Sequence, residues 1–251
     1  MERLWFIEKV RFEFQKNMLP KAKKSFSQNF LVNSAVVQKI VEAAQIKKGE
    51  HVLEIGSGTG ILTEALVKAG AKVLAVELDE ELIDDLQDKF DDKIKLFLGD
   101  ALELDLPIED RKFKLIANIP YNITSQILEK FLSRSPRPTK MVLMVQKEVA
   151  DRILEKPPKM SLLTVVCQIY AKCSRVTKVK AGSFRPIPKV DSAVVQFDLF
   201  DKFDFDPEEV VRFARMGFSS KRKQLHKNLS ASMKIDSEII KETLVQLKIN
   251  P

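Results

Sequence analysis

A glycine-rich segment in the first quarter of the chain has the residues of a ligand-binding turn. Glu54-Ile55-Gly56-Ser57-Gly58-Thr59-Gly60 follows a β-rich run and precedes a helical pattern. Glycines let the backbone turn sharply and approach a ligand without interference from a Cβ atom. Such a turn alone occurs in many nucleotide-binding proteins. Two details favour S-adenosylmethionine over a dinucleotide: Ile61 occupies the position of the third dinucleotide glycine, and the acid Glu54 precedes Gly56 by two residues.

Two further acids follow β-rich runs in a way that suits the same ligand. Glu77 ends the second run, about 20 residues after the first glycine, where a carboxylate can accept hydrogen bonds from both ribose hydroxyls. Asp100 follows the third run, where it can accept a hydrogen bond from the adenine amine of the cofactor. Acids are common in loops, so spacing alone leaves Asp100 open between a cofactor contact and an ordinary loop residue.

The segment Asn118-Ile119-Pro120-Tyr121 resembles the motifs of enzymes that methylate exocyclic amino groups of bases. Such an amine is a poor nucleophile because its lone pair is delocalised into the ring. The Asn118 side-chain oxygen and the Ile119 carbonyl can accept hydrogen bonds from the amine, which favours a pyramidal nitrogen. Tyr121 can stack on the base, a contact worth about 1–3 kcal/mol. The competing interpretation is a plain strand-to-loop turn with a buried tyrosine.

The pattern of the middle of the chain alternates between strand and helix and predicts how these motifs are positioned. We expect strands at residues 51–55, 72–78, 94–98, 113–117 and 140–145, and helices at 61–69, 79–90 and 124–132. This alternation predicts an α/β fold with a mostly parallel sheet and helices on both faces. The motifs above then gather outside the carboxyl ends of the strands.

The remainder of the chain predicts a sheet edge and a helical appendage. Residues 175–179 and 193–199 are expected to form a hairpin-like pair at the edge of the sheet, and 208–246 to be helical throughout. We therefore divide the chain into an N-terminal extension (1–20), an α/β domain (21–200) and a helical domain (201–251). The extension is either an amphipathic helix or a consequence of start-site choice, with Met18 as the true initiator.

Composition limits the partners. Two cysteines and two histidines argue against a disulfide framework or a protein-held metal and suit a reducing, cytosolic setting. No apolar run approaches the roughly 20 residues that cross a bilayer. The net charge is +7, and residues 134–189 carry 13 Lys and Arg against three acids. This excess indicates a polyanion partner, although a solvated basic face is the alternative.

Taken together, these motifs resemble the KsgA/RsmA dimethyladenosine transferases of the small ribosomal subunit, which are relatives of the Erm methyltransferases. The resemblance covers residues from about 21 to 230. It depends on the glycine loop, Glu77, Gly99-Asp100 and three longer segments: Phe26-Ser27-Gln28-Asn29-Phe30-Leu31, Asn118-Ile119-Pro120-Tyr121-Asn122-Ile123 and Phe184-Arg185-Pro186-Ile187-Pro188-Lys189-Val190-Asp191-Ser192.

The resemblance implies a Rossmann-like methyltransferase fold with a mostly parallel seven-stranded sheet and a small all-helical, RNA-binding C-terminal domain. It implies that S-adenosylmethionine is the cofactor, without a metal. The cofactor contacts that it implies are Asn29, Leu31, Gly56, Gly58, Glu77, Asp100 and Asn118. The implied catalytic residues are Asn118, Pro120, Tyr121 and Phe184, with Phe184 stacking on a flipped adenine opposite Tyr121.

The implied substrate is two adjacent adenines in the 3′-terminal hairpin of small-subunit (16S) rRNA in the pre-30S particle. Each would become N6,N6-dimethyladenosine during subunit biogenesis, made by a monomeric cytoplasmic enzyme. Two alternatives stay open: an Erm-type enzyme acting on large-subunit rRNA, and a non-catalytic assembly factor. The basic segment at 221–229 resembles the RRKTLRNSL helix of the KsgA branch, from which Gln224 and His226 depart.

Overall fold

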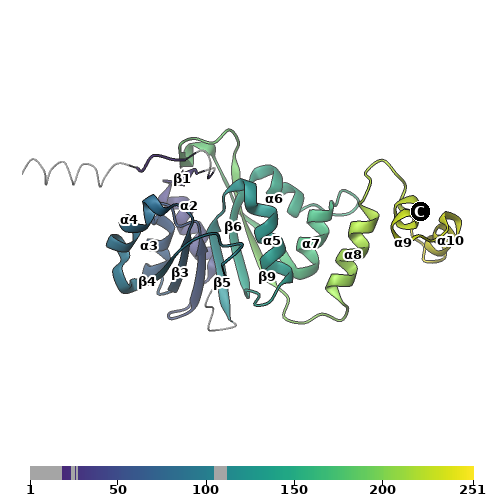
Figure 1. The fold of residues 1–251 in the computed structure, drawn as a ribbon, viewed down its shortest axis with the longest axis horizontal. Coiled ribbons are helices and arrows are strands. Elements are labelled where there is room, and N and C mark those ends of the chain that lie inside the picture. The colour runs from purple at the N-terminus through teal and green to yellow at the C-terminus, as the bar shows by residue number, and fades with distance from the viewer. Residues whose placement is uncertain (1–18, 24–25, 27, 105–111) are drawn as a thin grey trace, which may run out of the picture.

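A seven-stranded sheet forms the centre of the molecule (Figure 1). The computed structural model describes residues 19–23, 26, 28–104 and 112–251. The strand order is β4-β3-β2-β5-β6-β9-β7, and the first five strands in that order are parallel. The strands are β2 (His51–Ile55), β3 (Lys72–Glu77), β4 (Ile94–Leu98), β5 (Phe113–Asn118), β6 (Lys140–Gln146), β7 (Ala171–Val179) and β9 (Ser192–Leu199).

Helices cover both faces of this sheet, because successive side chains of a strand point to opposite sides. Leu53 and Leu115 belong to one buried cluster, with side chains of α5, α6 and α7. Their neighbours Val52 and Ile116 belong to the other, with side chains of α2, α3 and α4. These helices are α2 (Ser34–Ala44), α3 (Ile61–Lys68), α4 (Ile83–Phe90), α5 (Thr124–Ser133), α6 (Lys147–Ile153) and α7 (Leu162–Tyr170).

The predicted α/β architecture is confirmed, with strand bounds that differ from the expected ones by one residue or a few. β9 runs antiparallel between β6 and β7, so the expected pair of strands does lie at the sheet edge. β7 begins at Ala171, four residues before the predicted start. The expected helix at 79–90 begins as a single 3-10 turn, Glu80–Leu82, after the Asp79 side chain caps Glu81.

A second, two-stranded sheet was not predicted. It pairs β1 (Phe30–Leu31) with β8 (Phe184–Arg185), with Phe30 opposite Arg185 and Leu31 opposite Phe184. Two residues per strand give no detectable sequence periodicity. The pairing brings a segment near the N-terminus to a segment more than 150 positions later. Both therefore lie at the carboxyl edge of the parallel strands (Figure 1).

The prediction of continuous helix over 208–246 is wrong. Three helices occupy this region: α8 (Pro207–Gly217), α9 (Leu225–Met233) and α10 (Ser237–Gln246). The Asn228 side-chain amide donates to the carbonyls of Gly217 and Ser220, which stabilises the first break. Lys234 has a left-handed backbone, which ends α9, and Asp236 caps α10. The apolar spacing persists across both breaks, so it conceals them.

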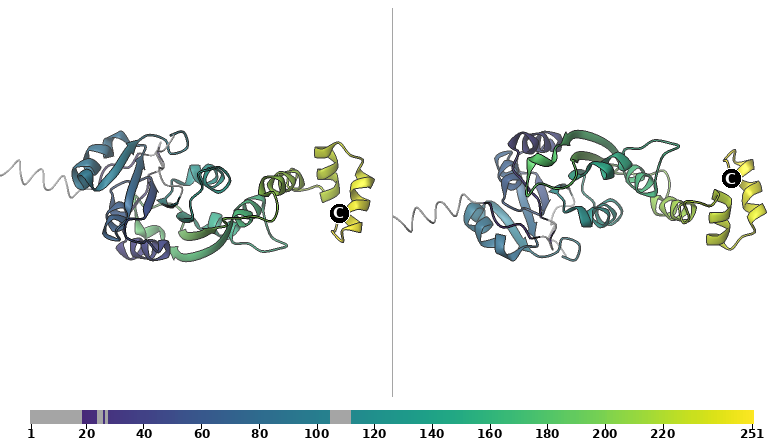
Figure 2. Two further views of the ribbon diagram at one scale, coloured as in Figure 1. Left: turned by 90° about the horizontal axis from the view of Figure 1, so that it is seen from below. Right: turned by 90° about the horizontal axis from the view of Figure 1, so that it is seen from above.

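The C-terminal helices extend away from the sheet. α8 packs against α7, whereas α9 and α10 project beyond it in every view (Figure 2). Leu229, Ile240 and Leu244 form a small separate core there. The expectations for the N-terminal extension concern residues 1–20, of which 1–18 lie outside the described residues. Within the described part of the chain, no helix is long and apolar enough to span a membrane.

We predict that Gly60→Ala lowers the free energy of unfolding by about 1–3 kcal/mol. Gly60 has φ +74°, and a Cβ atom there would lie 2.6 Å from Cε2 of Phe90. Urea-induced unfolding measures the effect. Gly182→Ala is the matched control, because no atom lies within 4 Å of its added Cβ. Equal stability of the two variants would contradict this account of the glycine loop.

Candidate functional site

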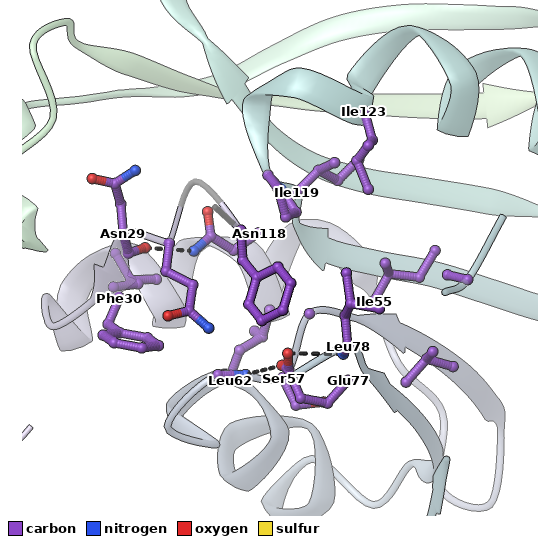
Figure 3. Close-up of a pocket in the computed structure, with 18 of the residues that line it drawn as sticks. Asn29, Phe30, Ile55, Ser57, Leu62, Glu77, Leu78, Asn118, Ile119 and Ile123 are labelled. Atoms are coloured by element: carbon purple, nitrogen blue, oxygen red, sulfur yellow. Dashed lines mark hydrogen bonds between the residues drawn. The ribbon is translucent and has the colours of Figure 1, made fainter. Parts of the chain in front are cut away.

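One pocket opens at the carboxyl edge of the parallel strands (Figure 3). Its walls come from the segment before α2, the loop after β2, and the ends of β3, β4 and β5. Nine of the residues expected in the site line it, and the tenth, Phe184, does not. The nine are Asn29, Leu31, Gly56, Gly58, Glu77, Asp100, Asn118, Pro120 and Tyr121.

Glu77 fixes the glycine loop in place. Its Oε2 accepts a hydrogen bond from the Gly58 amide at 2.8 Å, and its Oε1 accepts from the amides of Leu78 and Asp79 at 2.9 and 3.0 Å. Each carboxylate oxygen has more than one acceptor site, so lone pairs remain for a ligand on the pocket side. Glu77 is therefore a positioned acceptor at the end of β3 rather than a free surface acid.

The N-terminal segment is held over the pocket by contacts that the sequence did not predict. Asp79 accepts hydrogen bonds from Lys23 Nζ at 2.6 Å and from Gln28 Nε2 at 2.7 Å. Burial alone would raise the pKa of Asp79, but these donors outweigh it and lower the pKa. Phe30 packs beside Gly58, where an added Cβ would lie 3.2 Å from its Cδ1. We call residues 19–23, 26 and 28–31 the N-terminal strap.

Asn118 has a defined orientation at the end of β5. Its Nδ2 donates to the backbone carbonyl of Asn29 at 3.3 Å (Figure 3). This hydrogen bond uses one of the two Nδ2 hydrogens and orients the side chain, which lines the pocket. Gly56 lies directly alongside, since a Cβ atom there would come within 3.7 Å of the Asn118 carbonyl oxygen. The glycine loop and the Asn-Ile-Pro-Tyr segment thus lie side by side.

Tyr121 and Asp100 are also fixed by hydrogen bonds. The Tyr121 hydroxyl pairs with Ser192 Oγ at 2.7 Å, and burial raises the pKa of the phenol more than this hydrogen bond lowers it. Asp100 Oδ1 accepts from the Leu102 amide at 2.8 Å. Tyr121 therefore presents its ring as a neutral, oriented surface. Asp100 lies on the loop after β4, next to Gly99.

Phe184 is buried and does not line the pocket. It is 0% exposed, packs within the core cluster beneath α2, and pairs through its backbone with Leu31. Phe184 does not line the pocket, so stacking on a base would require its ring to move out of this core. The physical reason is the apolar environment: Val179 and Val194 belong to the same cluster and stabilise the buried rotamer.

Three buried polar side chains lie in and beside the glycine loop. Glu54 is 0% exposed, and neither its carboxyl oxygens nor Ser57 Oγ nor Thr63 Oγ1 has a hydrogen-bond partner among the described residues. Burial raises the pKa of Glu54 to about 8, and the nearby charge of Glu77 adds a smaller rise. The protonated form is therefore favoured at neutral pH.

We predict that Glu54 makes the protein less stable as the pH rises. Its pKa is about 8 when folded against an ordinary 4.5, so between these values the folded state keeps a proton that the unfolded state has lost. The contribution of protonated Glu54 to the free energy of unfolding is fully present below pH 4.5. It is lost as the pH rises toward 8, by at most about 1.4 kcal/mol per pH unit.

Glu54→Gln keeps the shape and removes the titration. Urea unfolding at pH 6, 7 and 8 should show a shallower loss of stability in Glu54→Gln than in the unaltered chain. Glu103→Gln, at an exposed acid in the loop after β4, is the control for a general charge effect. Parallel pH profiles for all three proteins would show that Glu54 ionises normally.

No three His, Cys, Asp or Glu side chains of the described residues are grouped so as to hold a metal ion.

A family model described as ribosomal RNA adenine dimethylase matches residues 19–249. A ribosomal RNA small subunit methyltransferase A of Dehalococcoides mccartyi is 39% identical over 92% of this chain and 82% of its own length. One of Crocosphaera subtropica is 38% identical over 92% of both.

Solved structures agree with the family match. A dimethyladenosine transferase from Plasmodium falciparum superposes with a TM-score of 0.74 and 33% identity, covering 88% of this chain and 83% of that one. The 23S rRNA methyltransferase ErmE gives 0.72 and 26%, covering 88% and 91%. The family model's match, residues 19–249, includes the C-terminal helices as well as the sheet. The chain belongs to the ribosomal RNA adenine dimethylase family of S-adenosylmethionine-dependent methyltransferases.

Proposed function

We propose that this enzyme transfers methyl groups from S-adenosylmethionine to N6 of two adjacent adenines in the 3′-terminal hairpin of small-subunit rRNA. The product is N6,N6-dimethyladenosine, and the reaction belongs to small-subunit biogenesis. The observation that carries the chemistry is the orientation of Asn118, whose nitrogen donates to Asn29 and whose oxygen is left for an amine. The names of the relatives that are 38–39% identical support the choice of subunit.

The residues of the pocket fit the cofactor. The Glu77 carboxylate, already positioned by three amides, accepts hydrogen bonds from the ribose hydroxyls. Gly56 and Gly58 let the loop backbone lie against the ligand, and Asp100 accepts from its adenine amine. Asn29 and Leu31 of the strap cover it. When bound, S-adenosylmethionine supplies an electrophilic methyl group at a sulfonium centre.

The protein's contribution to methyl transfer is positioning. Asn118 Oδ1 and the Ile119 carbonyl accept hydrogen bonds from the N6 amine. These hydrogen bonds turn the nitrogen lone pair toward the methyl group. Pro120 fixes the turn that presents this carbonyl, and Tyr121 stacks on the base. Phe184 contacts the opposite face after its ring leaves the core. The alkylated nitrogen is acidic and gives up its proton readily, so no strong base is required.

The helical domain, residues 201–251, binds RNA in this proposal. Lys221, Arg222 and Lys223 are exposed in the break before α9. They add to the basic excess of residues 134–189 and favour contact with phosphates. We propose that the protein acts as a monomer on the pre-30S particle in the cytoplasm. Gln224 and His226, which differ from the RRKTLRNSL pattern, have defined places in the structure. Gln224 is the N-cap residue of α9, and His226 is buried.

A second candidate is an enzyme that methylates large-subunit rRNA, which the likeness to ErmE favours. Transfer of labelled methyl groups to unmodified small and large subunits separates the two. Label recovered as dimethyladenosine in the 3′-terminal hairpin of the small subunit supports the proposal. Label in large-subunit rRNA alone would replace it with the second candidate. Binding without any label would favour a non-catalytic assembly factor.

We predict that Asn118→Ala lowers the rate of methyl transfer by at least about 100-fold, because the amine loses its oriented acceptor. RNA affinity should change less than about three-fold, since the phosphate contacts are elsewhere. Single-turnover transfer and filter binding measure the two quantities. Asn122→Ala is the matched control, an exposed asparagine of the next turn that does not line the pocket. Turnover by Asn118→Ala at the rate of this control would refute the role of Asn118.

A further inference from the structure

The loop between β8 and β9 exposes two aliphatic side chains next to the pocket. Ile187 is 62% exposed and Val190 is 45% exposed. Ile187 lies between Pro186 and Pro188. Single exposed aliphatic side chains are common on protein surfaces, so the exposure of Ile187 matters here for its place beside the pocket and for the charge around it. The methyl-transfer chemistry does not use either residue.

Both ends of this loop are tied to the wall of the pocket. At the start, Arg185 pairs with Phe30, which lines the pocket. At the end, Ser192 Oγ is hydrogen-bonded to the hydroxyl of Tyr121 at 2.7 Å. The loop therefore lies at the rim of the adenine side of the site. Figure 1 shows the green segment after β8 at the same edge as β1.

The loop is also stiff. The pyrrolidine rings of Pro186 and Pro188 fix φ on both sides of Ile187, and a residue before proline is restricted to extended conformations. Asp191 ties the far end, because its carbonyl accepts from the Lys147 amide and its carboxylate from the Ala181 amide, both at 3.0 Å. Little conformational entropy remains to be lost when Ile187 contacts a partner.

The charge around the exposed pair is positive. Arg185 and Lys189 flank Ile187 and are exposed, whereas the carboxylate of Asp191 is engaged by Lys180 at 3.2 Å and by a backbone amide. A stiff aliphatic tip between two cations suits a nucleic acid, in which the apolar faces of the bases lie between phosphates. It does not suit a lipid surface as well, because only two aliphatic side chains are presented.

We propose that Ile187 is a wedge that enters the base stack of the RNA beside the target adenine and holds that adenine out of the stack. The inference rests on the proposed function, since a base must leave its stack to reach the pocket. Aliphatic wedges of this kind unstack neighbouring bases in other nucleic-acid complexes. Val190 supports the wedge from the same loop, and Arg185 and Lys189 contact the phosphates on either side. Ile187 is thus a positioning residue that lowers the cost of exposing the adenine.

The test compares two RNA hairpins that carry the target adenine. One is intact, and the other has an abasic site next to the target, so that the adenine is already unstacked. We expect Ile187→Ala to lower kcat/KM about ten-fold on the intact hairpin and less than about two-fold on the abasic one. Ile187→Leu should restore activity on the intact hairpin, because it keeps an aliphatic tip. Circular dichroism and cofactor titration check that the variants fold and bind S-adenosylmethionine.

Ile239→Ala is the matched control, an isoleucine of 57% exposure on α10, far from the pocket. It should change the activity on the two hairpins by the same factor. An equal loss on both hairpins for Ile187→Ala would make Ile187 an ordinary binding contact and overturn the proposal, as would no loss on either. If the unaltered protein methylates neither hairpin nor small subunits, the proposed function fails, and this inference fails with it.

Discussion

The parallel pairing of β2 with β5 is the constraint on which the site depends. Ile55 lies opposite Ala117 in this pair, so the next residues along the chain, Gly56 and Asn118, emerge together at the carboxyl edge. A Cβ atom on Gly56 would lie 3.7 Å from the Asn118 carbonyl oxygen. In the proposed function, the first segment carries the loop that holds the cofactor and the second carries the acceptor for the amine. The sheet register would then set the distance between methyl donor and methyl acceptor.

Segments from outside the central sheet complete the site. The N-terminal strap is held by Asp79, which follows β3, and by the short pairing of β1 with β8. The same pairing fixes the start of the loop that carries Ile187, and Ser192 fixes its end through Tyr121. The same contacts therefore connect the part of the pocket proposed for the cofactor with the part proposed for the adenine. A displacement of the strap would move residues in both parts, which suits a reaction that depends mainly on alignment.

The sequence allowed the central architecture to be predicted because its signals are local. Alternating β-rich and helical patterns place Glu77, Asp100 and Asn118 after successive strands, and parallel strands end at one edge. The roles of Lys23, Gln28 and Asp79 were missed, since their contacts join residues more than 50 positions apart and have no periodic signature. Gln28 belongs to a recognisable motif, and Asp79 follows Glu77 by two residues, so only their partnership was hidden.

Two other regions depend on contacts that the local pattern does not show. The helix predicted over 208–246 was wrong because the apolar spacing continues through two breaks, which depend on the Asn228 amide and on the left-handed backbone of Lys234. The stacking of Phe184 on a base stays a prediction, and the burial of its side chain in a cluster with Val179 and Val194 was not expected. In both regions, contacts between residues far apart in the sequence determine the structure, and the local sequence pattern does not show these contacts. The burial of Glu54 is a third example, because the sequence does not show whether an acid within a central strand is ionised.

The central claim is that one pocket holds the cofactor against Glu77 and the target adenine against Asn118. A crystal structure with S-adenosylhomocysteine and a short hairpin RNA tests it most directly. We predict that the ribose hydroxyls lie within about 3 Å of the Glu77 carboxylate and the adenine N6 within about 3 Å of Asn118 Oδ1. An adenine bound with its N6 directed away from Asn118, or a cofactor bound outside the glycine loop, would contradict the account.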